Sequence, residues 1–170
     1  FMPGWTDYTK RVYSRAYDVT QLLKTGTNAV GVELGDGWYT GYVGYGQHRD
    51  FYGTRTRALV QLEVEYSDGS TETIASSPEW LASTGPTLEA DFLMGENYDA
   101  TREMAGWDKP DFDSIGWNKV DVGAELSPAV EPFPGQPVRP HQELRAKTIT
   151  EPKPDAYVLD LGQNMAGFAR

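Results

Sequence analysis

Frequent chain breaks are the feature that most limits how this sequence can fold. Its 18 Gly and 11 Pro make up 29 of 170 residues, about one in six against roughly one in eight on average. Turn signals recur about every 8–12 residues, and no sustained amphipathic helix lies between them. The 5 Trp, 10 Tyr and 6 Phe argue against disorder. We therefore expect an all-β fold, a β-sandwich or jelly roll of short antiparallel strands with long loops.

Composition excludes several classes of protein. The formal net charge is −10, which argues against nucleic-acid binding. No cysteine is present, so a disulfide framework or a thiolate metal site is impossible. No apolar run approaches the roughly 18 residues of a membrane span. The acidic balance fits an extracellular protein, whereas the lack of cysteine fits the periplasm and the cytoplasm equally.

Alternation of apolar and polar residues predicts some of the strands, and short apolar runs predict others, among them a buried strand over 28–34. The Asp68-Gly69 turn makes the hairpin of 57–66 and 70–76 the most secure of them. One helical turn is expected over 18–24, one long ordered loop over 38–56 and an extended proline-rich segment over 127–140. The other expected strands cover 11–17, 28–34, 80–82, 87–92, 98–103, a stretch near 120, 144–150 and 157–161.

Two stretches carry side chains suited to ligands. In the loop that begins at Asp36, rings alternate with polar groups that include Arg49. Aromatic faces stack on the C–H faces of sugars, although these rings could instead pack the loop onto a sheet. Residues 95–99 (GENYD) could bind Ca²⁺ through oxygen ligands, or form a turn whose side chains bond the local backbone.

No catalytic constellation stands out. A glycosidase needs two carboxylates about 5–10 Å apart, but none of the 25 acids is singled out by the sequence. His48 and His141 are isolated. Phosphate-binding, dinucleotide-binding and Gly-x-Ser-x-Gly motifs are absent. We assign no catalytic residue.

A series of phrases resembles one family along nearly the whole chain. The family is the N-terminal β-sandwich domain of bacterial α-L-rhamnosidases, glycoside hydrolase family 78. The matching phrases are residues 3–12, 17–23, 28–31, 34–39, 95–100, 106–107 and 160–164.

The resemblance implies a multidomain parent enzyme that removes terminal α-L-rhamnose from plant glycosides and pectic polysaccharides. Such enzymes invert configuration, with acids on a separate (α/α)6 barrel C-terminal to these residues. We therefore expect this fragment alone to be inactive. The implied partners are rhamnose-containing glycans and the catalytic barrel and other β-domains of the same chain. The implied location is extracellular, periplasmic or at the surface of a bacterium.

In some family members a β-sandwich of this kind binds rhamnose through Ca²⁺. No cofactor is expected to be required, but the comparison makes calcium an option, with ligands Asp36, Asn97 and Asp99. A purely structural spacer that packs on the barrel is the alternative function. The expected substrate-binding residues are Asp36, Trp38, Tyr39, Tyr42, Tyr45 and Asn97.

The resemblance also sets the expected domains. Residues 1–126 form the N-terminal β-sandwich domain, 127–140 a proline-rich crossing, and 141–170 the last strands and the start of the next β-domain. The family domain begins earlier, with a strand pair, so the first strands are missing here. A missing strand leaves an open sheet edge, which predicts a gap in the sandwich or strand pairing between chains.

Overall fold

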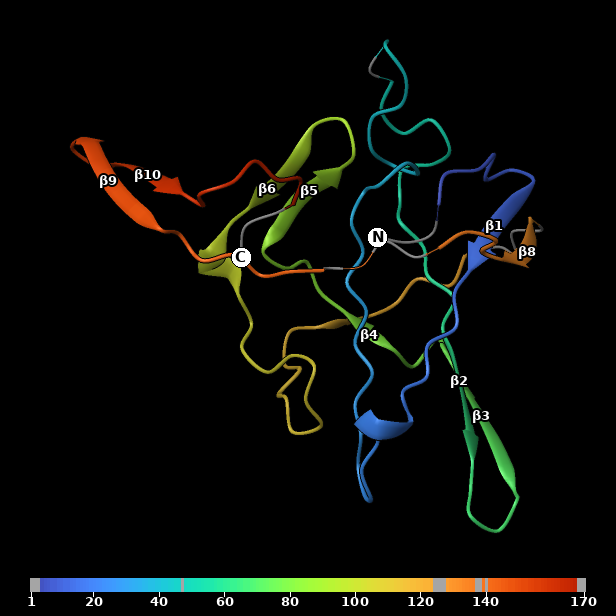
Figure 1. Ribbon diagram of the computed structural model, residues 1–170. Coiled ribbons are helices and arrows are strands. Elements are labelled where there is room, and N and C mark those ends of the chain that lie inside the picture. The colour runs from blue at the N-terminus through green and yellow to red at the C-terminus, as the bar shows by residue number, and fades with distance from the viewer. Residues whose placement is uncertain (1–3, 47, 124–127, 137–138, 140, 168–170) are drawn as a thin grey trace. The chain divides into compact units, whose positions relative to one another are not determined.

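The computed structural model describes residues 4–46, 48–123, 128–136, 139 and 141–167 (Figure 1). The chain divides into two compact units, residues 2–133 and 134–170. The sequence-based boundaries at 126 and 140 stay a prediction, since residues 124–127, 137, 138 and 140 lie outside the described part.

Short strands dominate both units, and the predicted all-β class is confirmed. Over the described residues they form five two-stranded sheets, four antiparallel and one parallel. Strand pairing between chains stays a prediction. In the first unit β1 (Arg11–Ser14) pairs with β8 (Ala129–Pro132), β2 (Gln61–Glu65) with β3 (Thr71–Ala75), β4 (Leu81–Ala82) with β7 (Asn118–Lys119), and β5 (Thr87–Asp91) with β6 (Gly95–Tyr98). In the second unit β9 (Thr148–Lys153) pairs with β10 (Ala156–Asp160).

The predicted hairpin around Asp68-Gly69 is confirmed as β2 and β3. Gly69 has a φ of 82°, a left-handed conformation that glycine adopts without steric cost. The turn is closed by a hydrogen bond from Tyr66 N to Ser70 O of 2.8 Å. Local turn chemistry was sufficient to locate this element.

Two predicted strands are wrong. Residues 28–34 pair with no strand in the described part of the chain, and Val30, Val32 and Leu34 are exposed. This segment was predicted to be a buried strand, but a short apolar run supplies no pairing partner by itself. Over 98–103 the chain instead forms a 3₁₀ turn, η2 (Ala100–Arg102), and the helical turn over 18–24 is reduced to η1 (Thr20–Leu22).

Burial in the first unit centres on the long loop. Tyr8 is 8% exposed, and among the described residues it is the only hydrophobic side chain that is buried. Thr40, in the loop, is 3% exposed. The packed centre therefore lies where the N-terminal residues meet the loop that carries most of the candidate ligand-binding side chains.

Candidate functional site

The turn at Asp36 is anchored on β5. Gly37 N donates to Ala90 O at 2.8 Å, and Ala90 N donates back to Asp36 Oδ2 at 3.1 Å. The Asp36 carbonyl accepts from Tyr39 N and Thr40 N at 3.2 and 3.1 Å. This exchange with a strand fixes where the aromatic loop begins.

An ion network lies beside this turn. Arg49 donates to Asp36 Oδ1 at 3.3 Å and to Glu89 Oε1 at 2.6 Å. The Asp36 side chain is 18% exposed and that of Arg49 33%, so the network is only partly screened by water. The guanidinium lies 5.5 Å from the centre of the Tyr42 ring. Glu89 was not expected, because only the tertiary fold brings β5 to the loop.

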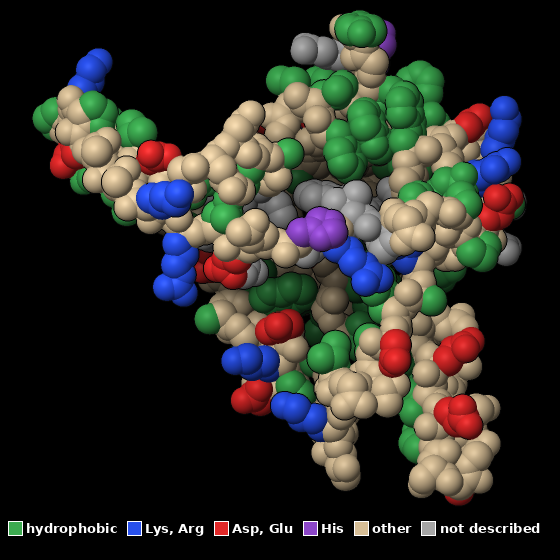
Figure 2. Space-filling view, viewed as in Figure 1, with side chains coloured by type: hydrophobic (Ala, Val, Ile, Leu, Met, Phe, Trp, Pro, Cys, Tyr) green, Lys and Arg blue, Asp and Glu red, His purple; other side chains and the backbone are tan. Residues whose placement is uncertain are grey.

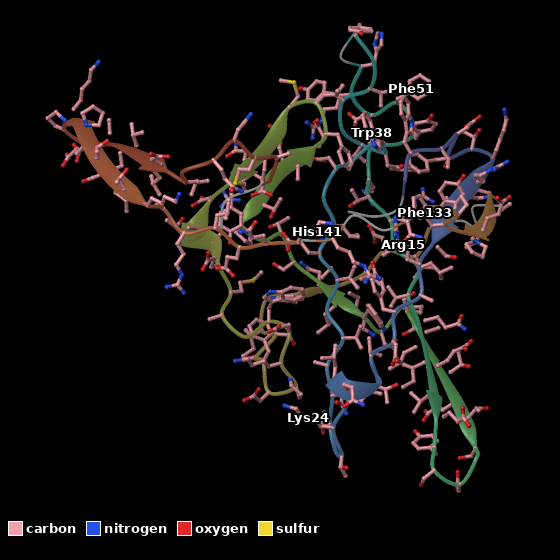
Figure 3. All side chains as sticks on the ribbon, in the orientation of Figure 1. Arg15, Lys24, Trp38, Phe51, Phe133 and His141 are labelled. Atoms are coloured by element: carbon pink, nitrogen blue, oxygen red, sulfur yellow. The ribbon has the colours of Figure 1, made fainter. Side chains whose placement is uncertain are left out.

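Trp38 forms the middle of a three-ring stack. Its centroid lies 4.7 Å from that of Trp5 and 5.0 Å from that of Phe92, with interplanar angles of 17° and 9°. Trp5 and Phe92 are each 52% exposed. Parallel rings cover both faces of Trp38, so Trp38 itself offers no open ring face to a ligand. Figure 3 shows Trp38 and Phe51 projecting from the same loop.

Tyr39 belongs to a second ring cluster, around Tyr8. The Tyr8 ring lies 5.7 Å from Tyr39 and 4.9 Å from Tyr52. Burial, with a smaller contribution from Tyr52, raises the pKa of Tyr8 to about 12. A Cβ at Gly53 would come within 2.7 Å of the Tyr39 ring, so a glycine there allows this packing. Tyr39 contributes to the packed centre of the unit.

Other rings of the loop face solvent. Tyr45 is fully exposed and Phe51 is 64% exposed, and Figure 2 shows hydrophobic side chains at the surface over this loop. Tyr42 is half-buried, and its backbone N donates to Asp91 Oδ2 at 3.4 Å. The loop thus contains both packed and solvent-exposed rings. The packed rings fit a structural role for the loop, and the exposed rings are available for a ligand.

Asn97 lies on β6, and Asp99 follows directly after that strand. Asn97 is exposed on β6 and pairs in register with Glu89, which Arg49 holds. Asp99 caps η2, accepting from Thr101 N and Thr101 Oγ1 at 3.0 and 2.6 Å. Hydrogen bonds from Thr101 are the largest cause of its lowered pKa. Asp99 therefore forms the local turn that was one interpretation of residues 95–99.

Two of the three predicted calcium ligands, Asp36 and Asp99, have hydrogen-bonding roles of their own. Both carboxylate oxygens of Asp36 accept hydrogen bonds, and Asp99 Oδ2 pairs with Arg102 Nε at 3.2 Å. In the described residues no three His, Cys, Asp or Glu side chains gather in a group able to hold a metal ion. Calcium takes 6–8 oxygen ligands, more than these side chains present together, and the ion stays a prediction.

A groove of about 340 Å³ lies next to the ring stack. Its lining combines two aromatic rings with hydroxyl, carboxylate and cationic groups. None of these residues stands out in the sequence as a ligand-binding candidate, although Trp5 lies within one of the phrases that carry the family resemblance. The groove is lined by Trp5, Thr6, Asp7, Lys10, Arg11 and Tyr13.

In the described part of the chain, no helix has the length and apolarity needed to cross a membrane.

Fold and site together define a small all-β domain that presents aromatic rings beside hydrogen-bonding side chains. Residues 1–142 match the family model of the Alpha-L-rhamnosidase N-terminal domain. The chain belongs to this family, and the resemblance seen in its sequence is confirmed.

The relatives are much longer proteins. An alpha-L-rhamnosidase from Streptomyces avermitilis is 49% identical over 174 residues, which cover 99% of this chain and 16% of the relative. Another, from Alteromonas sp., is 36% identical and covers 97% and 18%. This chain therefore spans about one sixth of the length of these relatives.

Solved structures show the same relation. The crystal structure of Streptomyces avermitilis alpha-L-rhamnosidase complexed with L-rhamnose matches with a TM-score of 0.78 and 46% identity, over 96% of this chain and 16% of that one. The alpha-L-rhamnosidase from Dictyoglumus thermophilum matches with a TM-score of 0.76 and 33% identity, over 95% and 17%.

Proposed function

We propose that this chain is a non-catalytic carbohydrate-recognition domain of an α-L-rhamnosidase that hydrolyses terminal α-L-rhamnose from plant glycosides or pectic polysaccharides. Its ligands are rhamnose-containing glycans. The observation that carries the proposal is that one loop presents the exposed rings of Tyr45 and Phe51 together with Arg49, which pairs with Asp36 and Glu89. Membership of the rhamnosidase family supports it.

The chemistry of the site suits sugars. An aromatic ring offers a flat apolar surface to the C–H face of a pyranose, and its rigidity limits the entropy lost on binding. Charged groups form stronger hydrogen bonds than neutral ones, so Arg49 and Glu89 can orient hydroxyl groups. Few polar groups among apolar ones are typical of small-molecule sites.

The pKa shifts of four aspartates support a non-catalytic role for this chain. Glycosidic general acids have raised pKa values. Asp7, Asp18, Asp68 and Asp99 have lowered pKa values instead, chiefly because a Ser or Thr hydroxyl two residues later donates to each carboxylate. Hydrolysis is assigned to a catalytic barrel elsewhere in the longer parent chain, outside the cytoplasm of a bacterium.

One observation favours a spacer as the second candidate function. The turn between β5 and β6 exposes Phe92, Leu93 and Met94 at 52%, 48% and 56%. Asp91 Oδ1 accepts from Leu93 N and Met94 N, both at 2.7 Å, and so holds this apolar turn in shape. An exposed apolar turn of this kind suits packing against another domain of the same chain.

A titration separates the two functions. The ¹H–¹⁵N NMR spectrum of the chain is recorded with increasing L-rhamnose, first with calcium and then with excess chelator. Recognition predicts saturable shifts, and their loss with chelator would make binding calcium-dependent. An unchanged spectrum at tens of millimolar sugar, in a sample that unfolds cooperatively on heating, would reject recognition and favour the spacer.

A further inference from the structure

We propose that the groove beside Trp5 is a saccharide subsite, in which one neutral pyranose ring stacks on the open face of Trp5. This inference rests on the proposed recognition function and gives it a location that the loop residues alone do not provide. The groove measures about 340 Å³, at the small end of the roughly 300–1,000 Å³ of small-molecule sites. That size suits one sugar unit of a longer glycan.

Both aromatic walls of the groove are held by further rings. Trp5 stacks on Trp38 at 4.7 Å, so the part of its indole that lines the groove is the open face or edge. Tyr13 meets Phe133 edge to face at 5.5 Å, and Phe133 also packs against the Arg15 guanidinium at 3.8 Å (Figure 3). Rings supported in this way lose little freedom on binding, which favours affinity.

The polar lining comes from a turn that is itself rigid. The Asp7 carboxylate accepts from Thr9 N and Oγ1 at 3.1 and 2.6 Å. The Asp7 carbonyl accepts from Lys10 N and Arg11 N at 2.9 and 3.0 Å. Thr6 Oγ1 donates to Arg11 O at 2.6 Å. The backbone of this turn is therefore held in place, and the oxygens of Thr6 and Asp7 are presented beside the rings.

Charge in the groove favours a neutral sugar. Lys10 pairs with Asp7 at 3.1 Å, and Arg11 pairs with Glu131 at 3.4 Å. Each cation is already paired with a carboxylate, so the groove offers an anionic sugar no excess positive charge. A neutral hydroxyl can instead share these exposed pairs, since the charged groups keep spare hydrogen-bonding capacity.

In this arrangement the loop residues Trp38 and Asp36 hold Trp5 and the loop in place and do not bind the sugar directly. Trp38 lies between two rings, and Asp36 bonds the loop to β5. Neither is as open to a ligand as Trp5, which is 52% exposed. We therefore assign direct stacking to Trp5 and positioning of Trp5 to Trp38.

L-rhamnose affinity, measured by NMR titration, tests this assignment. Trp5→Ala is expected to weaken binding at least about tenfold, the equivalent of one lost stacking contact. Trp5→Phe keeps a ring and is expected to stay within about threefold. Tyr157→Ala is the matched control, truncation of an exposed ring on β10 that belongs neither to the groove nor to the aromatic loop, and is expected to leave affinity unchanged. Wild-type shifts should centre on the amides of 5–13.

Each other result has a distinct meaning. Normal affinity in Trp5→Ala with weakened binding in the loop variant Tyr45→Ala would overturn the groove and leave the proposed function intact. No binding by wild type would reject both. Tighter binding of D-glucuronate than of L-rhamnose would overturn the neutral-sugar assignment. Thermal unfolding of each variant identifies loss of fold, and Tyr13→Ala, expected to weaken binding, supplies a second test if Trp5→Ala unfolds.

Discussion

The groove and the tip of the aromatic loop both present rings to solvent, but only the groove supports them. Trp5 rests on Trp38, and Tyr13 on Phe133. Tyr45, at the loop tip, is fully exposed. A ring with another ring behind it keeps one orientation, whereas a fully exposed side chain samples several rotamers. Exposure alone is therefore a poor guide to which ring recognises a ligand.

Removal of the central ring of the stack should have the largest effect. Trp38→Ala takes away the surface on which both Trp5 and Phe92 rest. Because Trp38 is half-buried, we expect a loss of about 2–3 kcal/mol in the free energy of unfolding, together with loss of L-rhamnose binding. Urea denaturation measures the stability change. Phe51→Ala is the control. Equal losses of unfolding free energy in the two variants would contradict a particular role of the three-ring stack in stability.

The ion network that holds the loop should rank second. Arg49→Met leaves the largely covered Asp36 carboxylate without its cation, and we expect a loss of about 1 kcal/mol, discounted for partial exposure. Arg55→Met is the matched control, because its pair with Asp121 is 77% and 84% exposed. That control should change stability by less than about 0.5 kcal/mol. Indistinguishable denaturation midpoints would contradict a structural role for the network.

Acid should destabilise the chain through its short aspartate turns. Asp7, Asp18, Asp68 and Asp99 have folded pKa values below 3.8. Their stabilising contribution is complete above pH 3.8 and is lost as the pH falls through the folded pKa values. The contribution of these aspartates to Tm should be constant from pH 8 to about 5, and Tm should drop at lower pH. Thr9→Val, which removes a hydroxyl donor to Asp7, should reduce the drop; an unchanged profile would contradict this origin.

The smallest effect should come from the loop tip. Tyr45→Ala removes a fully exposed ring, so its free energy of unfolding should change by less than about 0.5 kcal/mol. Urea denaturation checks this value. A larger loss of unfolding free energy would mean that Tyr45 is covered in solution. The loop tip and the groove would then not differ in how their rings are supported.

Local chemistry made several elements predictable. The Asp68-Gly69 turn located β2 and β3 because glycine at positive φ closes a hairpin. Asp99 forms a turn with Thr101 through contacts only two residues long. By contrast, the strand expected over 28–34 needs a partner from elsewhere in the chain, and a short apolar run carries no information about that partner.

The candidate site divides in the same way. The aromatic loop and Asp36 can be identified from the sequence, because many aromatic residues follow Asp36 within one short stretch. Glu89 and Phe92 cannot be identified from the sequence, because they reach the site only when β5 and the turn after it pack on the loop.

By itself, the sequence determined the all-β class, the family and the turns, because each depends on residue identity and short-range hydrogen bonds. Only the tertiary structure decided which rings are supports and which are open. Trp38 and Trp5 are equivalent as residues, and they differ only because Trp38 is covered by rings from two distant parts of the chain. Packing between distant segments, which leaves no local signal, separates the two roles.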